Sequence, residues 1–174
     1  LGKPRLFFGV SAGCMDSMVN KYTANKRLRS EDAYTPDGRH DMRPEYPTIV
    51  YTKILKKLWP EVPVIIGGIE ASLRRLTHYD YWQDTVRKSI LIESGADLLV
   101  YGMGEKPIIE LCQRMKESPF IPTDVPQTAY VVKGKQAIPP SISDKEDIML
   151  HSHEACVSDK KKEAENFRFI EEES

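Results

Sequence analysis

The residues best suited to bind a ligand follow two adjacent glycines, Gly67 and Gly68, which come directly after the apolar run 64–66. Two neighbouring arginines, Arg74 and Arg75, carry planar forks of N–H donors that suit a carboxylate or a phosphate. Backbone N–H groups at a glycine turn that opens a helix would attract the same anions. Acidic and aromatic side chains stand among them: Glu70, Tyr79 and Trp82. The acidic group could instead pair with the arginines in a purely structural network, so both interpretations stay open.

Two other apolar runs, 6–10 and 98–101, also end in glycine turns. Gly13 follows the first run, and Gly102 and Gly104 follow the second. Short apolar runs are typical of strands buried on both faces of a parallel sheet, whose carboxyl ends all lie on one edge. None of the turns has the spacing of a known nucleotide-binding loop. We therefore expect one shared ligand-binding or interdomain edge, formed by Gly13, Gly67, Gly68, Glu70, Arg74, Arg75, Tyr79, Trp82, Gly102, Gly104 and Glu105.

Segments between and after these runs have apolar residues at helical spacing. The first opens at Pro47, which is well placed in a first helical turn, and its stripe Val50, Ile54 and Leu58 is expected to pack on the sheet. Strands that alternate with helices predict right-handed crossovers, and hence a flavodoxin-like or Rossmann-like three-layer α/β fold with a parallel sheet and helices on both faces. The expected helices cover residues 47–58, 82–94 and 107–115.

The pattern changes in the last third of the chain. Residues 128–133 and 136–138 flank Gly134 and predict a β-hairpin. The composition then becomes strongly charged, which is typical of a solvated helix or a linker. We therefore expect a domain over residues 1–140 and a charged linker or helical tail over residues 141–174.

Composition restricts the possible partners and the compartment. With 25 Lys and Arg against 26 Asp and Glu, the net charge of −1 gives no general attraction for nucleic acid or for a membrane. The apolar runs are too short to cross a bilayer and no signal peptide opens the chain, so we expect a soluble protein. Three widely spaced cysteines, Cys14, Cys112 and Cys156, are typical of reduced thiols in the cytoplasm. His151 and His153 lie near the last of them, but the spacing does not favour a metal site.

Several blocks of this sequence resemble the N-terminal region of YgiQ-type radical-SAM proteins, an uncharacterised bacterial family. The resemblance covers most of residues 1–140, and the longest block is highly specific. It implies a cobalamin-binding-like α/β domain that precedes a radical-SAM barrel. The blocks are 3–13 (KPRLFFGVSAG), 16–24 (DSMVNKYTA), 32–36 (DAYTP), 66–75 (IGGIEASLRR), 78–84 (HYDYWQD) and 96–99 (ADLL).

The resemblance also implies the chemistry of a longer parent protein. Such a parent would bind a [4Fe-4S] cluster through a Cys-x-x-x-Cys-x-x-Cys motif and cleave S-adenosylmethionine. Neither this motif nor the Asp-x-His-x-x-Gly cobalamin signature occurs here. We therefore expect a barrel downstream of Ser174 as the partner of this domain, which would be accessory, with no catalytic residues, metal or cofactor of its own and an unknown substrate.

A second hypothesis comes from a different functional class. The chain could be a stand-alone module that binds RNA or an anionic small molecule through Arg74, Arg75 and the basic segment 21–43. The balanced net charge does not support the RNA form of this hypothesis.

Overall fold

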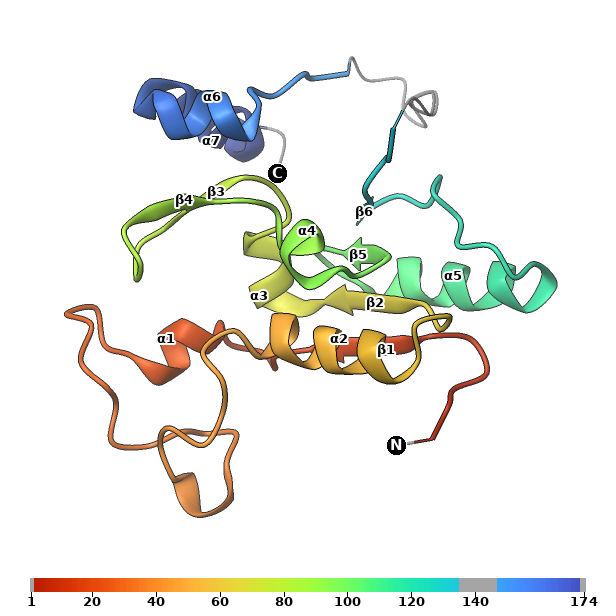
Figure 1. Cartoon of the computed structure of the whole chain (residues 1–174), viewed down its shortest axis with the longest axis horizontal. Coiled ribbons are helices and arrows are strands. Elements are labelled where there is room, and N and C mark those ends of the chain that lie inside the picture. The colour runs from red at the N-terminus through yellow and green to blue at the C-terminus, as the bar shows by residue number, and fades with distance from the viewer. Residues whose placement is uncertain (1, 135–146, 173–174) are drawn as a thin grey trace.

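The computed structural model describes residues 2–134 and 147–172, and a four-stranded sheet lies at its centre (Figure 1). Its strands are β1 (Phe8–Ser11), β2 (Val64–Gly67), β5 (Leu98–Val100) and β6 (Thr128–Ala129), in the order β1-β2-β5-β6. The first three are parallel and β6 is antiparallel to β5. The sheet is therefore mixed but mostly parallel, and the three apolar runs form parallel neighbours as the sequence predicts.

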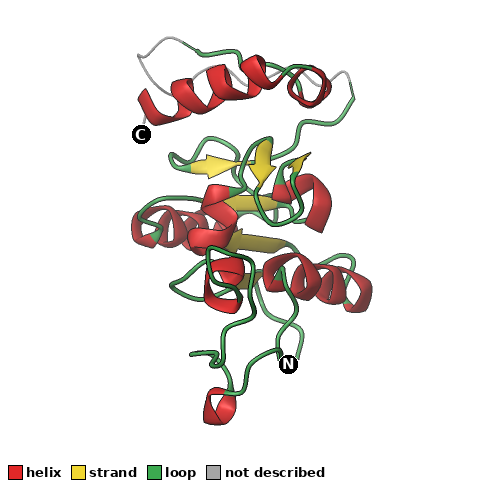
Figure 2. Cartoon of the chain, turned by 90° about the vertical axis from the view of Figure 1, so that its left-hand side faces the viewer, coloured by secondary structure: helices red, strands yellow, loops and turns green. Residues whose placement is uncertain are grey.

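Helices cover both faces of this sheet, as Figure 2 shows. On one face, α2 (Pro47–Leu58) and α4 (Ile90–Ser94) pack over a core that contains Ile66. On the other face, α5 (Glu105–Glu117) packs over a second core that contains Ile65. Because consecutive strand residues point to opposite faces, a wholly apolar strand supplies both cores at once. This arrangement confirms the three-layer α/β fold.

The face that α2 turns toward the sheet differs from the expected one. Val50, Ile54 and Leu58 are 37%, 50% and 59% exposed, whereas Thr48 and Thr52 are fully buried. Both sets recur at helical spacing, so periodicity indicates a helix without deciding which stripe faces inward. Small threonine side chains let the helix lie close to the sheet, and the backbone contact at Thr48 described below ties its first turn to α3.

The helix expected over residues 82–94 is wrong in its first half. The chain there forms an antiparallel hairpin of β3 (His78–Asp80) and β4 (Thr85–Arg87), and only α4 is helical. The Asp80 carboxylate accepts hydrogen bonds from the backbone N–H groups of Trp82 and Gln83, at 2.9 and 3.0 Å, and so builds the turn. Side-chain bonds of this kind compete with helix formation.

Two short helices connect the strands to the rest of the fold. The helix α1 (Ser17–Lys21) follows β1, and α3 (Gly68–Leu73) begins directly at the end of β2. Between α1 and α2 runs a long connection whose regular part is the 3₁₀ helix η1 (Pro36–Gly38). The two short helices start at the carboxyl ends of strands, so they place their side chains at the predicted edge.

The C-terminal part is helical, as its charged composition predicts. It contains α6 (His153–Ser158), which contacts β4, and α7 (Lys160–Glu172). Of the hairpin expected over 128–138, only β6 (Thr128–Ala129) forms, and it pairs with β5. Residues 130–133, expected in the same strand, are not in a strand, and residues 136–138 lie outside the described residues. No helix in the described part of the chain is long and apolar enough to cross a membrane.

Candidate functional site

The carboxyl ends of β1, β2 and β5 meet at one edge, as the sequence predicts. Ser11 pairs with Gly67 in the sheet, and Gly68 has a positive φ of 79° that suits glycine. A Cβ on Gly68 would lie 2.5 Å from the Ser11 hydroxyl oxygen and 3.5 Å from the Gly13 carbonyl oxygen. A Cβ on Gly67 would lie 3.2 Å from the Val100 carbonyl oxygen. The glycine turns are therefore packed against one another.

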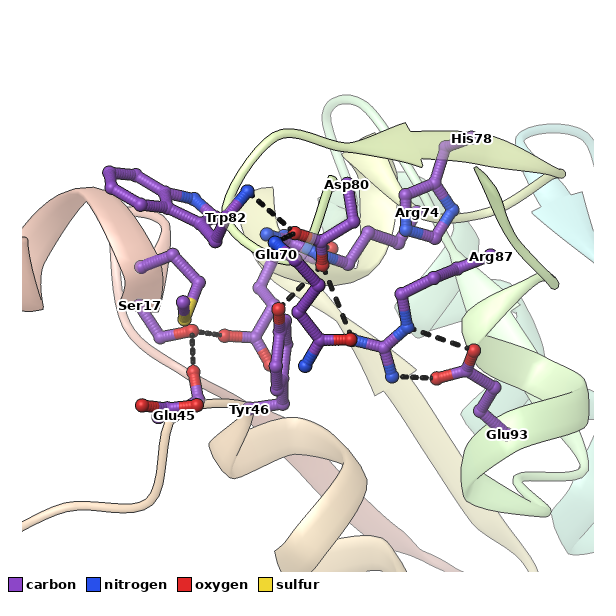
Figure 3. Close-up of polar contacts among 12 residues, drawn as sticks. Ser17, Glu45, Tyr46, Glu70, Arg74, His78, Asp80, Trp82, Arg87 and Glu93 are labelled. Atoms are coloured by element: carbon purple, nitrogen blue, oxygen red, sulfur yellow. Dashed lines mark hydrogen bonds and ion pairs between the residues drawn. The ribbon is translucent and has the colours of Figure 1, made fainter. Parts of the chain in front are cut away.

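Glu70 is fully buried beneath this edge and binds the protein itself (Figure 3). Its carboxylate accepts a hydrogen bond from the backbone N–H of Thr48 at 3.0 Å and a short one from the Ser17 hydroxyl. The N-cap residue of α2, Tyr46, makes no capping hydrogen bond with its side chain. The first N–H groups of a helix have no partners within it, so Glu70, a residue of α3, caps the start of α2. The dipole of α2 also favours a carboxylate at this end.

Arg74 is also buried, and it pairs with Asp16 rather than with the Glu70 side chain. Its Nη1 lies in short contact with one Asp16 oxygen, and its Nη2 lies 3.4 Å from the other. Asp16 also caps α1, accepting from the Met18 N–H at 3.1 Å. Burial disfavours the charged form of Arg74 and by itself would lower its pKa. The hydrogen bond and the negative charge of Asp16 outweigh this effect, and the pKa of Arg74 is raised. The pair therefore joins α3 to α1.

A second buried network surrounds Tyr46 (Figure 3). The Tyr46 hydroxyl donates to the Asp80 carboxylate at 2.5 Å, and Arg87 bridges Asp80 and Glu93. The guanidinium carbons of Arg87 and Arg74 lie 4.4 and 5.6 Å from the Tyr46 ring centroid. Burial and the Asp80 carboxylate raise the pKa of the Tyr46 phenol. This network fastens the β3–β4 hairpin to α2 and α4.

Trp82 holds the tip of the hairpin against the long connection. Its ring lies 5.5 Å from that of Tyr22, and its carbonyl oxygen accepts from Lys26 at 3.2 Å. Tyr79 is half exposed, and its hydroxyl binds Asp84. These contacts are internal to the protein, so the aromatic residues of the predicted edge support the hairpin.

The basic residues of segment 21–43 are largely engaged within the chain. Lys21 pairs with Asp41 at 2.7 Å, and Arg43 pairs with Asp32 at 3.1 Å. Arg29 donates to backbone carbonyl oxygens of α1 and of the residue after it. Cations with internal partners are less available for phosphates.

Of the two arginines at the predicted edge, Arg75 is the one that remains available to bind an anion. Its Nη1 donates to the Ser72 carbonyl oxygen at 2.9 Å, and its guanidinium lies 4.9 Å from the Tyr101 ring centroid. It lines two cavities, one of which also contains Gly102. Glu105 is exposed in the first turn of α5, directly after Gly104. The edge is thus divided into a buried structural half and an open half around Arg75.

The most important partners in the buried half were not foreseen from the sequence. Asp16 and Ser17 complete the networks of Arg74 and Glu70, and Tyr46, Asp80 and Arg87 form the second buried network. An aspartate directly before a short helical segment is a typical N-cap, and this signal could have identified Asp16.

The cysteines do not form a cluster site. Cys14 is exposed after β1, Cys112 is half-buried in α5, and Cys156 is buried in α6, where the Asn166 amide lies 3.2 Å from its sulfur. His151 binds Glu165 at 2.8 Å. Within residues 2–134 and 147–172, no three His, Cys, Asp or Glu side chains are grouped to hold a metal ion. A [4Fe-4S] cluster needs gathered cysteine thiolates, so these residues do not fit one.

Comparison with known proteins gives a consistent match. The family model described as Radical SAM N-terminal matches residues 1–174. A UPF0313 protein of Bacteroides thetaiotaomicron is 65% identical over 189 residues, which cover 100% of this chain and 30% of that protein. One of Porphyromonas gingivalis is 66% identical over 177 residues, covering 100% and 27%. UPF0313 protein YgiQ of Escherichia coli is 56% identical over 141 residues, covering 80% and 19%. The chain therefore spans less than a third of each of these relatives, and no solved structure matches it.

Proposed function

The chain belongs to the Radical SAM N-terminal family, and from this membership we propose that it is the accessory N-terminal domain of a radical-SAM iron–sulfur enzyme. The observation that carries the proposal is the match of the family model to the whole chain, together with relatives that are more than three times as long. A [4Fe-4S] cluster and S-adenosylmethionine belong, in this proposal, to a downstream radical-SAM domain of the same polypeptide.

The residues of this chain support a scaffolding role. The cysteines do not fit a cluster, and two of the four charged residues that the sequence singles out at the edge, Glu70 and Arg74, are tied into buried networks. Such networks fix the positions of α1, α2 and α3 relative to the sheet. We propose that this rigid edge contacts the downstream domain or presents a substrate to it. The unpaired thiols support a reducing compartment, so the cytoplasm is our proposed location.

The proposal is tested by comparing the intact protein with the fragment 1–174. The intact protein, with its cluster reconstituted, is expected to form 5′-deoxyadenosine from S-adenosylmethionine and a reductant, and the fragment is expected to form none. Chromatography of the quenched reaction measures the product. Absence of 5′-deoxyadenosine from the intact, cluster-loaded protein would overturn the assignment to radical-SAM chemistry.

The RNA-binding form of the second hypothesis gains little support. Arg74 is buried against Asp16, and much of the positive charge in segment 21–43 has internal partners. The anion-binding form depends on Arg75 alone.

A further inference from the structure

Two cavities meet at Arg75, on the open half of the edge. One, of about 590 Å³, lies between the β3–β4 hairpin and α7. The other, of about 740 Å³, lies between α3, the carboxyl end of β5 and α7, and we call it the strand-end cavity. Both volumes fall within the range of small-molecule sites. The strand-end cavity is lined, among others, by Arg75, Tyr101, Gly102, Gln127, Leu150 and Phe169.

The described residues that line the strand-end cavity carry an unbalanced charge. Among the described residues that line it, only Arg75 is charged. Other arginines of the α/β body pair with carboxylates, such as Arg87 with Asp80 and Arg43 with Asp32, but no described carboxylate lies within ion-pair distance of Arg75. A partly buried cation without a counter-charge is unfavourable, so the site favours an anion.

The geometry of Arg75 leaves its binding edge available. One N–H donates to the Ser72 carbonyl oxygen and the guanidinium carbon lies 4.9 Å from the Tyr101 ring centroid, and the two contacts together hold the group in place. Its remaining N–H donors have no hydrogen-bond partners among residues 2–134 and 147–172. A pre-positioned guanidinium fork binds planar carboxylates and phosphates with two parallel hydrogen bonds.

Gln127 supplies a second polar group in an unusual backbone conformation. Its φ of 58° is positive, and its carbonyl oxygen accepts from the Tyr101 N–H at 3.0 Å. Its side-chain amide has no partner in the described part of the chain, and its Nε2 would lie 3.2 Å from a Cβ on Gly102. Gly102 therefore leaves room for this amide. Non-glycine residues with positive φ are frequent at binding sites.

Most of the remaining lining residues are apolar, and Ser72 is the polar one among those described. Leu76, Ile148, Leu150 and Phe169 contribute hydrocarbon surface, and Phe169 comes from α7. A ligand that fills this volume must therefore carry an apolar body as well as an anionic group. We propose that the strand-end cavity binds a small organic anion, whose carboxylate or phosphate pairs with Arg75 and whose body packs against α7. This site goes beyond the accessory role proposed above, because binding here requires no radical chemistry.

Binding is tested on the intact protein by ligand-observed NMR titration at low ionic strength. Benzoate and phenyl phosphate are the probes and distinguish a carboxylate ligand from a phosphate ligand, while benzyl alcohol is the matched neutral compound. At least one anionic probe is expected to bind saturably, and benzyl alcohol is expected to bind roughly tenfold more weakly or not at all. Equal binding of the neutral compound, or no binding of either anion, would overturn the proposal.

Three variants assign any binding to Arg75. Arg75→Gln is expected to lower the affinity for the anionic probe roughly tenfold or more. Arg27→Gln, at an exposed arginine outside the cavity, should leave this affinity unchanged. Ser72→Glu places a carboxylate three residues before Arg75, and it should abolish anion binding while preserving the fold. This variant therefore tests the site even if Arg75→Gln fails to fold. Unchanged affinity in Ser72→Glu and in folded Arg75→Gln would contradict the site.

Discussion

Arg74 and Asp16 are 58 positions apart in the sequence, yet they form an ion pair in which both side chains are more than 90% buried. Asp16 also caps α1, so one carboxylate serves the start of a helix and the charge of an arginine. Removing one partner of a buried pair leaves the other charge without compensation.

We therefore expect Arg74→Ala to destabilise the chain by roughly 3–5 kcal/mol. For a domain of this size, a loss of that magnitude lowers the melting temperature by on the order of 10 °C. Thermal denaturation followed by circular dichroism measures the change. Arg75→Ala is the matched control, since Arg75 has no ion-pair partner among the described residues, and it should shift the melting temperature little. Equal melting temperatures for Arg74→Ala and the unmutated chain would show that the Arg74–Asp16 pair has no structural role.

The Asp80 carboxylate predicts a pH dependence of stability. Burial opposes its ionisation, but hydrogen bonds from Tyr46, Gln83 and Arg87 outweigh this effect, so the pKa of Asp80 lies below its usual value in the folded chain. A group whose folded pKa is lowered stabilises the fold above its unfolded pKa of about 3.9, and this contribution is lost as the pH falls through the folded pKa.

Asp80→Asn should therefore lower the melting temperature at pH 6, and its difference from the unmutated chain should shrink as the pH falls below about 3.9 toward the folded pKa. The measurement is a series of thermal melts across this pH range. A difference that stays constant with pH would mean that ionisation of Asp80 does not stabilise the fold.

The orientation of α2 gives a third prediction. Ile49 belongs to the core and Ile54 is half exposed, although both are isoleucines on one helix. Ile49→Ala should cost roughly 2–5 kcal/mol of unfolding free energy, as large-to-small substitutions in a core do. Ile54→Ala should change stability by less than about 0.5 kcal/mol, as surface substitutions do. Denaturant titration of the two variants compares them directly, and a larger cost at Ile54 would restore the orientation expected from the sequence.

The parallel strands could be predicted because each is a short apolar run, and an apolar run buried on both faces has few alternatives to a central strand. The face of α2 could not, because two stripes share the helical period and the choice depends on Glu70, a residue of another helix. The hairpin at 78–87 was missed because the Asp80 side chain, rather than hydrophobic spacing, builds its turn.

The candidate site, like the fold, could be predicted from the sequence only in part. The convergence of glycine turns on one edge follows from strand polarity, which the sequence reveals. Whether Arg74 or Arg75 stays open depends on Asp16, whose partner is distant in the chain. Residue types alone could not distinguish the two arginines.

The last prediction concerns the contact between the first two strand ends. Gly68 combines a positive φ of 79° with a position where a Cβ would lie 2.5 Å from the Ser11 hydroxyl oxygen. Gly95 has a similar φ of 73°, but a Cβ there would meet nothing within 4 Å. Gly95→Ala should therefore cost about 1 kcal/mol through backbone conformation alone, and Gly68→Ala should cost clearly more, because it adds a steric overlap. Chemical denaturation gives both values. Adding Ser11→Ala to Gly68→Ala removes the obstructing hydroxyl and should recover part of the excess over Gly95→Ala, offset by the lost hydrogen bond from the Gly13 N–H to this hydroxyl. If Gly68→Ala and Gly95→Ala are equally destabilised, the strand ends are not packed as tightly as the structure shows.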